Sequence, residues 1–172
     1  MKKFNSPKAF AVHLERLALA TPVLMNRMAD KCGEIVEATA KAEVGNPMMY
    51  HPAMLGGPFR PWDELLPETE AEKSRLGYPM EAPLERTGGL KDSISRSTEG
   101  YRTVVGSTSP LMVYHEFGTL TLPPRPVIGP AVYMNKHLLE MGLAWSLCAF
   151  LAGESWKNQL RLNWKQRYGG SI

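Results

Sequence analysis

The sequence predicts an α+β fold in which long N-terminal and C-terminal helices pack on a small antiparallel sheet. Three observations predict this class. Apolar residues recur at helical spacing near both ends of the chain, and residues 93–107 are rich in Ser, Thr and Val around a central glycine. Between them lies a long irregular loop, 46–61, that is rich in Pro and Gly. We expect one two-layer domain over residues 1–153 and a separate extension over 154–172.

The first helix is predicted to begin at Ser6-Pro7, because a serine caps free N–H groups and proline at the first position needs no donor. Phe10, Leu14 and Leu17 then share one face. Thr21-Pro22 repeats the start signal, so the helix either kinks there or ends and restarts. A second stripe follows, and Gly45 ends the helix. The stripe consists of Met25, Met28, Cys32, Ile35, Val36 and Thr39.

The loop 46–61 exposes large apolar side chains that no regular element hides. They are Met48, Met49, Tyr50, Met54, Leu55 and Phe59. Two interpretations remain open: the loop folds over its own core, or it is an arm that docks on a neighbouring molecule. A short charged helix, 67–76, is predicted to follow and to end at Gly77.

The middle of the chain predicts a hairpin, with strands over 93–99 and 101–107 joined at Gly100. Ser109-Pro110 then starts a short helical turn that ends at Gly118. Three prolines at 123, 124 and 126 fix the backbone around Arg125 and remove N–H donors. An extended segment at a sheet edge or a rim is therefore expected.

A last long helix is predicted from Gly129-Pro130 to about Ala152. Its expected inward residues are Val132, Leu138, Leu139, Met141, Trp145, Cys148 and Leu151. In the extension, Trp156, Leu160 and Trp164 lie one helical turn apart among basic residues such as Arg161. Three interpretations of the extension remain open. It is a helix docked on its own molecule, or an amphipathic anchor for an adjacent subunit. The third interpretation, a nucleic-acid contact, is the one that the modest net charge supports least.

Composition narrows the function classes. The chain has 20 basic and 17 acidic residues among 172, a formal charge of +3, which does not indicate nucleic-acid binding. Cys32 and Cys148 lack metal-ligand spacing and are expected to be buried free thiols in a reducing cytoplasm. No secretory signal is expected, since polar residues interrupt the N-terminal apolar segment. The longest apolar run, 143–152, is far shorter than the roughly 20 residues of a membrane helix.

His115-Glu116 invites comparison with a zinc protease helix, but Thr119 stands where a second histidine is needed. We find no catalytic, cofactor-binding or metal-binding pattern elsewhere in the sequence. A structural role is therefore predicted for this turn. Tyr114 and Phe117 are expected to pack it, and the polar pair to hydrogen-bond neighbouring backbone or to face the next subunit.

Five groups of residues stand in a fixed order along the chain: Trp62; Thr87, Gly88, Leu90 and Ile94; Gly106; Tyr114, His115, Glu116, Phe117, Gly118 and Thr119; and Gly129 and Pro130. In this order and spacing they resemble the signature of phage tail-completion and head-tail joining proteins. That family includes the minor tail protein Z of lambda-like phages and the virion morphogenesis protein G of Mu-like phages. The chain departs from the family pattern at Val127, where an aromatic residue is frequent.

The resemblance implies a non-enzymatic structural virion protein, without cofactor, that completes the tail or joins tail to head in the neck. It also implies a ring of copies that contacts other neck and tail proteins, such as a connector, stopper, tail terminator or tail tube, after assembly in the host cytoplasm. Candidate subunit contacts are the apolar loop residues, the rim Pro124, Arg125 and Pro126, and Trp156, Arg161 and Trp164. The alternatives are a DNA-contacting connector at the channel exit and a hydrolase that uses His115 and Glu116.

Overall fold

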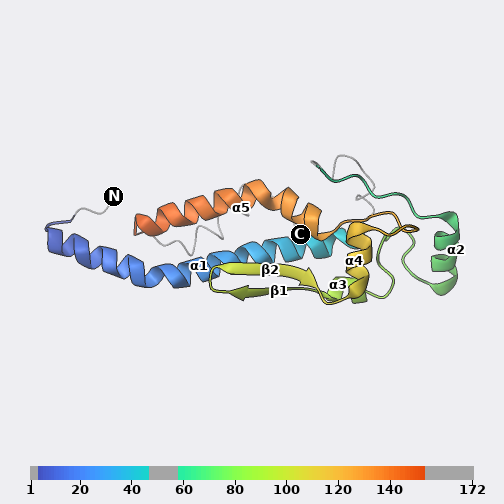
Figure 1. The fold of residues 1–172 in the computed structure, drawn as a ribbon, viewed down its shortest axis with the longest axis horizontal. Coiled ribbons are helices and arrows are strands. Elements are labelled where there is room, and N and C mark those ends of the chain that lie inside the picture. The colour runs from blue at the N-terminus through green and yellow to red at the C-terminus, as the bar shows by residue number, and fades with distance from the viewer. Residues whose placement is uncertain (1–3, 47–57, 154–172) are drawn as a thin grey trace.

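The computed structural model describes residues 4–46 and 58–153 of the chain, with the elements labelled in Figure 1. In chain order they are α1 (Pro7–Glu43), α2 (Pro67–Leu76), α3 (Gly89–Asp92), β1 (Ile94–Glu99), β2 (Arg102–Ser107), α4 (Pro110–Phe117) and α5 (Ile128–Leu151). This arrangement of long terminal helices and a small antiparallel sheet confirms the predicted α+β class.

The described part is elongated, with α1 running along most of its length (Figure 1). The hairpin packs on one side of α1, and α5 packs on the other. The expected two-layer arrangement, with both long helices on the sheet, is therefore wrong in detail. The described part has three layers, because one face of α1 contacts α5 and another contacts the strands.

The start and end of α1 follow the local signals. Ser6 Oγ accepts a hydrogen bond from the Ala9 N–H at 3.2 Å, which caps the helix. Pro22 lies inside the helix, so α1 neither ends nor restarts there. Beyond the other end, Gly45 adopts a positive φ of 83°, and its N–H donates to the Pro83 carbonyl at 2.9 Å.

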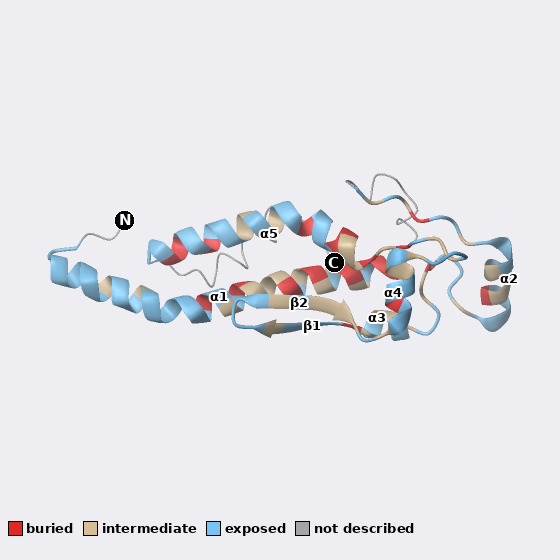
Figure 2. Cartoon of the chain, in the orientation of Figure 1, coloured by how far each residue is buried: buried red, intermediate tan, exposed pale blue. Residues whose placement is uncertain are grey.

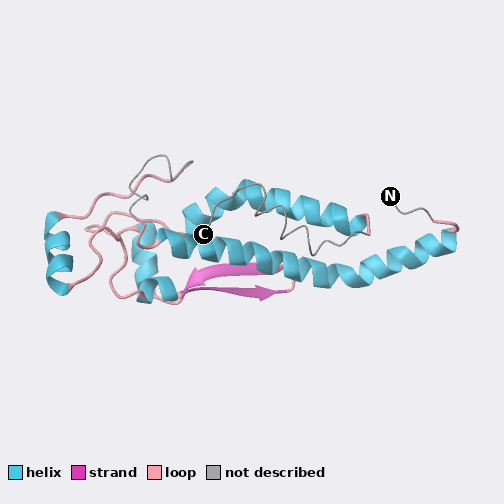
Figure 3. Ribbon diagram, turned by 180° about the vertical axis from the view of Figure 1, so that it is seen from behind, coloured by secondary structure: helices cyan, strands magenta, loops and turns pink. Residues whose placement is uncertain are grey.

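The hairpin has the predicted strands and turn, and Figure 3 shows it on the face of α1. Its antiparallel register pairs Ile94 with Ser107 and Glu99 with Arg102, and Gly100 supplies a positive φ of 59° at the turn. The strands lie close to α1 at Gly33, where even a Cβ atom would collide with the Thr103 hydroxyl. The missing side chain lets the sheet lie directly on the helix.

Polar side chains fasten the hairpin to α1 along the same contact. Arg96 forms ion pairs with Asp30 at 3.1 Å and with Glu37 at 2.5 Å. At the turn, the Asn26 side-chain amide donates to the Gly100 carbonyl at 2.9 Å. The hairpin is thus tied to α1 both at its centre and at its tip.

The main core lies where the second half of α1 meets the start of α5, the hairpin and the segment around Trp62 (Figure 2). Its buried members are Val36, Ala40, Val44, Trp62, Ile94, Met112, Val127 and Ala131. Val127 is fully buried in this core. A second, smaller cluster joins Leu24 and Met28 of α1 to Phe150 near the end of α5.

The predicted inward face of α5 is wrong at four of its seven residues, whereas Leu139 packs against the main core. Val132, Trp145, Cys148 and Leu151 are exposed, and Leu138, Leu139 and Met141 are intermediate. The buried residues of the helix are Pro130, Ala131, Asn135, Ser146, Ala149 and Phe150. Because α5 is apolar around most of its circumference, spacing alone does not identify the side that packs. The buried side chain of Asn135 donates a hydrogen bond from α5 to Thr39 Oγ1 of α1 at 2.8 Å.

Candidate functional site

Glu116 fixes α4 to the start of α5. One carboxylate oxygen accepts hydrogen bonds from the N–H groups of Val127 and Ile128 at 2.8 and 3.1 Å, and the other accepts from Gly129 at 2.8 Å. The first N–H groups of a helix have no partner inside it, and the positive end of the helix dipole favours an anion there. Glu116 therefore caps α5 from a different helix, which confirms the predicted hydrogen bonding to neighbouring backbone.

Arg125 holds the proline-rich segment in place. Its backbone N–H donates to the His115 carbonyl at 2.7 Å. Its guanidinium Nη2 donates to the carbonyls of Asp63 and Glu64 at 2.9 and 3.3 Å. Arg125 is only 8% exposed, so little of it is available to a neighbouring subunit, and its expected role as a subunit contact stays a prediction. Three prolines leave few backbone donors, and the buried guanidinium supplies the missing connection.

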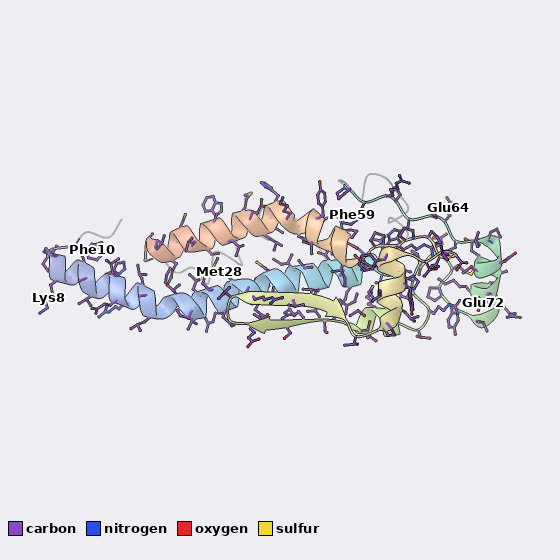
Figure 4. The ribbon with its side chains drawn as sticks, in the orientation of Figure 1. Lys8, Phe10, Met28, Phe59, Glu64 and Glu72 are labelled. Atoms are coloured by element: carbon purple, nitrogen blue, oxygen red, sulfur yellow. The ribbon has the colours of Figure 1, made fainter. Side chains whose placement is uncertain are left out.

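Trp62 also contacts this region, where α4, the proline-rich segment and the start of α5 meet. We call this region the junction. It is 3% exposed, and its indole N–H donates to the Pro126 carbonyl at 3.1 Å. Phe59, three residues earlier, packs edge-on against Tyr133 of α5, with the ring centres 6.1 Å apart, and Figure 4 places it beside the start of that helix. A Cβ at Gly129 would collide with the Phe59 ring, so this glycine permits the approach.

Glu43, at the last turn of α1, is the most unusual residue of the junction. It is 3% exposed, and within the described part of the chain neither carboxyl oxygen has a hydrogen-bond partner. Burial, together with the negative charge of Glu116, raises the pKa of Glu43 to about 9. At neutral pH the residue is therefore a neutral carboxylic acid in the core.

His115 is half-buried in the same region, and its Nδ1 has no partner among the residues that the structure describes. Burial, and secondarily the positive charge of Arg125, lowers the pKa of His115. The imidazole is thus neutral at neutral pH. The junction therefore contains the Glu116 carboxylate, which caps α5, together with the neutral carboxyl group of Glu43 and the neutral imidazole of His115.

Over residues 4–46 and 58–153, no group of three or more His, Cys, Asp or Glu side chains is arranged to hold a metal ion. The expectation that both cysteines are buried is wrong, because Cys148 is exposed and Cys32 is intermediate. Burial raises the pKa of the Cys32 thiol, which favours the unreactive protonated form. None of the helices in the described part is long and apolar enough to span a membrane.

The predicted packing role of the aromatic pair is also wrong. Tyr114 and Phe117 are 52% and 79% exposed, since α4 turns only Met112 into the core. Among the other candidate contacts, Pro124 is exposed, whereas Pro126 and Phe59 are partly buried. The remaining candidates, Met48, Met49, Tyr50, Met54, Leu55, Trp156, Arg161 and Trp164, lie outside the described residues.

The sequence interpretation missed Glu43 as a member of the junction. Its position does carry a signal, because Val36, Ala40 and Glu43 follow one another at helical spacing on the buried side of α1. A carboxyl group that continues an apolar stripe is expected to lie in the core.

Apolar side chains are exposed where α1 continues past the hairpin. Val12, Leu19 and Val23 are 39%, 81% and 54% exposed, and their spacing places them on one side of the helix. It is the side that carries the hairpin, because Asn26 follows Val23 by nearly one turn and binds Gly100. Tyr101, next to Gly100, is 80% exposed. We call these four residues the hairpin-side surface.

Comparisons of this chain with protein-family models, with characterised proteins and with solved structures yielded no match.

Proposed function

We propose that this chain is a structural virion protein of a tailed bacteriophage, which completes the tail or joins the tail to the head as a ring of identical subunits. The order of the motifs from Trp62 to Pro130 supports the family, as a resemblance. The observation that carries the assembly role is the hairpin-side surface, Val12, Leu19, Val23 and Tyr101. Exposed apolar patches on soluble proteins commonly mark interaction sites.

The junction supports this role in a different way. Its motif residues act on the chain's own backbone, since Glu116 caps α5 and Arg125 binds two carbonyls of the preceding segment. A carboxylate that accepts three backbone hydrogen bonds has little capacity left for proton transfer. The arrangement favours a rigid frame that presents surfaces over a hydrolytic site.

Ring formation requires one surface to meet a different surface of the next copy, repeated until the ring closes. We assign the hairpin-side surface to one half of this contact. A stripe on α5, formed by Leu143, Leu147 and Leu151, is a suitable second half, because these side chains are also exposed and lie one turn apart. The loop residues Met48 to Leu55 and the exposed Pro124 remain candidate contacts to other neck proteins.

The test uses a phage from which the gene has been removed, supplied with the protein from a plasmid. Without the protein, electron microscopy of lysates is expected to show full heads apart from tails. The variant Leu19→Asp with Val23→Asp should fold, fail to restore infectious particles and remain monomeric in light scattering. Leu120→Asp, at a fully exposed leucine away from this surface, is the control and should restore them. Normal particles in the absence of the protein would exclude the proposed function.

A further inference from the structure

Helix α4 turns its polar side towards the molecule and its apolar side towards solvent. Glu116 reaches inward to the backbone of α5, and His115 beside it is half-buried. The apolar side chains on the outward side are Leu111, Val113, Tyr114 and Phe117, which are 56%, 56%, 52% and 79% exposed. Spacings of three and four residues place them next to one another on the helix. We call these four residues the α4 surface.

This orientation is the reverse of the usual one, because a surface helix normally packs its apolar side on the core. The capping contact of Glu116 with α5 requires the polar side of α4 to face inward. The apolar side is therefore left outside, and Figure 2 shows α4 as largely exposed. Large aromatic side chains exposed next to other apolar residues commonly mark an interaction site.

The α4 surface also lies in a stretch that lacks surface charge. Residues 103–124 contain no Asp, Lys or Arg, and their single glutamate is the one that binds the backbone of α5. The centres of protein interfaces are likewise depleted in charged residues and enriched in aromatic ones. In a two-fold contact a surface meets its own copy, so any charge on it would face a like charge. A surface without charge is compatible with itself.

We propose that the α4 surface is a two-fold contact on which a second copy of this chain docks, with α4 against α4. Taking about 200 Å² for a whole aromatic side chain, Tyr114 and Phe117 together expose roughly 260 Å² per copy. Even with Leu111 and Val113 added, the area buried over both copies stays below the roughly 1,200 Å² of standard interfaces. The contact is therefore weak: dilute protein is monomeric, and the dimer forms when the protein is concentrated.

This inference does not depend on the proposed function. The proposed ring contact uses the first half of α1, the hairpin turn and the last turns of α5, whereas α4 follows the opposite end of the hairpin (Figure 1). The dimer is measured on purified protein, without particle formation. Failure of either proposal therefore leaves the other standing.

The first measurement traps the contact by disulfide formation. In a Cys32→Ala, Cys148→Ser background, Leu111→Cys, Val113→Cys and Tyr114→Cys are made one at a time. A two-fold contact brings a position near its axis against the same position of the second copy, so at least one variant should form a disulfide-linked dimer under mild oxidation. Trp145→Cys, at a position 50% exposed on α5, is the matched control and should form one at least about tenfold more slowly. Rates no faster than this control at all three positions would overturn the proposal.

The second measurement follows the dimer at equilibrium. Sedimentation of the full chain should show the mass of two molecules as the protein is concentrated, and Phe117→Asp should raise the dissociation constant at least about tenfold, since aromatic residues carry much of the energy of an interface. Trp145→Asp is the control and should leave the constant unchanged. A parent chain that stays monomeric, or equal weakening by both variants, would contradict the α4 contact.

Amide hydrogen exchange of the same samples identifies what covers α4. Residues 110–117 should exchange more slowly in concentrated than in dilute protein, because only the dimer protects them. Amides of the hairpin turn, away from the contact, should exchange equally in both and serve as the internal control. Protection of residues 110–117 that is the same at both concentrations would mean that the chain covers its own α4, and would exclude a second copy.

Discussion

Glu43 and Glu116 place two carboxyl groups in the same buried junction, and only Glu116 has partners for its charge. Glu116 accepts three backbone hydrogen bonds at the start of α5, whereas Glu43 has none within the described part of the chain. Two nearby carboxylates repel each other when both are ionised. The pair is stable because Glu43 keeps its proton, and this has consequences for the pH dependence of folding.

The first prediction concerns Glu43→Gln. The pKa of Glu43 is about 9 in the folded chain and 4.5 as an ordinary glutamate, so the folded chain holds a proton that the unfolded chain releases between these values. The free energy of unfolding should therefore fall as pH rises from about 5 to 9, by about 3 kcal/mol up to pH 7. Glu43→Gln should lose this part of the slope and be more stable than the parent above pH 7.

Urea unfolding at several pH values, followed by circular dichroism, measures the slope. Glu140→Gln, at an exposed position on α5, is the matched control and should keep the slope of the parent chain. Identical slopes for the parent and Glu43→Gln would show that Glu43 is not held neutral in the core.

The second prediction concerns the cap on α5. Glu116→Ala removes the acceptor for three N–H groups and should lower the free energy of unfolding by about 2 kcal/mol. Hydrogen exchange should also accelerate at residues 127–129. Glu140→Ala, which removes a glutamate from the exposed side of α5, should have a much smaller effect on both. Unchanged exchange at the start of α5 would contradict the capping role.

Glu116→Gln tests the electrostatic coupling between Glu116 and Glu43. It keeps a side-chain oxygen but removes the charge that disfavours ionisation of Glu43, so the pKa of Glu43 should fall. NMR titration of the Glu43 carboxyl carbon measures this shift directly. A Glu43 pKa that stays at its parent value would mean that burial alone sets it.

The third prediction concerns Arg125→Lys, which preserves the charge but not the planar donor group. Lysine cannot reproduce the guanidinium contacts with the carbonyls of Asp63 and Glu64, so the free energy of unfolding should fall by about 1–2 kcal/mol. Arg102→Lys, at an exposed position on β2, should change it by less than about 0.5 kcal/mol. Equal stability of the two variants would show that the buried guanidinium does not anchor the proline-rich segment.

Much of the fold follows from local signals in the sequence. The Ser6 cap, the Gly100 turn and the Gly77 helix end are where they were predicted, because each depends on the backbone preferences of one or two residues. The layer order was not predictable in this way. α5 is apolar on most sides, and its buried residues include the small Ala131, which packs with Val36 and Ala40 of α1.

The candidate site was predicted only in part, because its contacts join segments that are far apart in the sequence. Glu116 was expected to hydrogen-bond backbone, but nothing in its own segment indicates that the backbone belongs to the start of α5. Arg125 was assigned to a sheet edge or rim because the flanking prolines exclude a central strand. Its burial depends on carbonyls located 61 and 62 residues away in the chain. Contacts between distant segments are set by the complete fold and leave little trace in local patterns.

The last prediction compares two glycines inside helices, where alanine is intrinsically favoured by about 1 kcal/mol. Nothing lies within 4 Å of a Cβ built at Gly142 of α5, so Gly142→Ala should raise the free energy of unfolding by about 0.5–1 kcal/mol. At Gly33 of α1 the new Cβ would collide with the Thr103 hydroxyl and press on Arg96. Gly33→Ala should therefore leave the free energy of unfolding unchanged or lower it. It should also accelerate hydrogen exchange in β2. Equal stabilisation by both substitutions would show that the hairpin does not lie as closely on α1 as the structure places it.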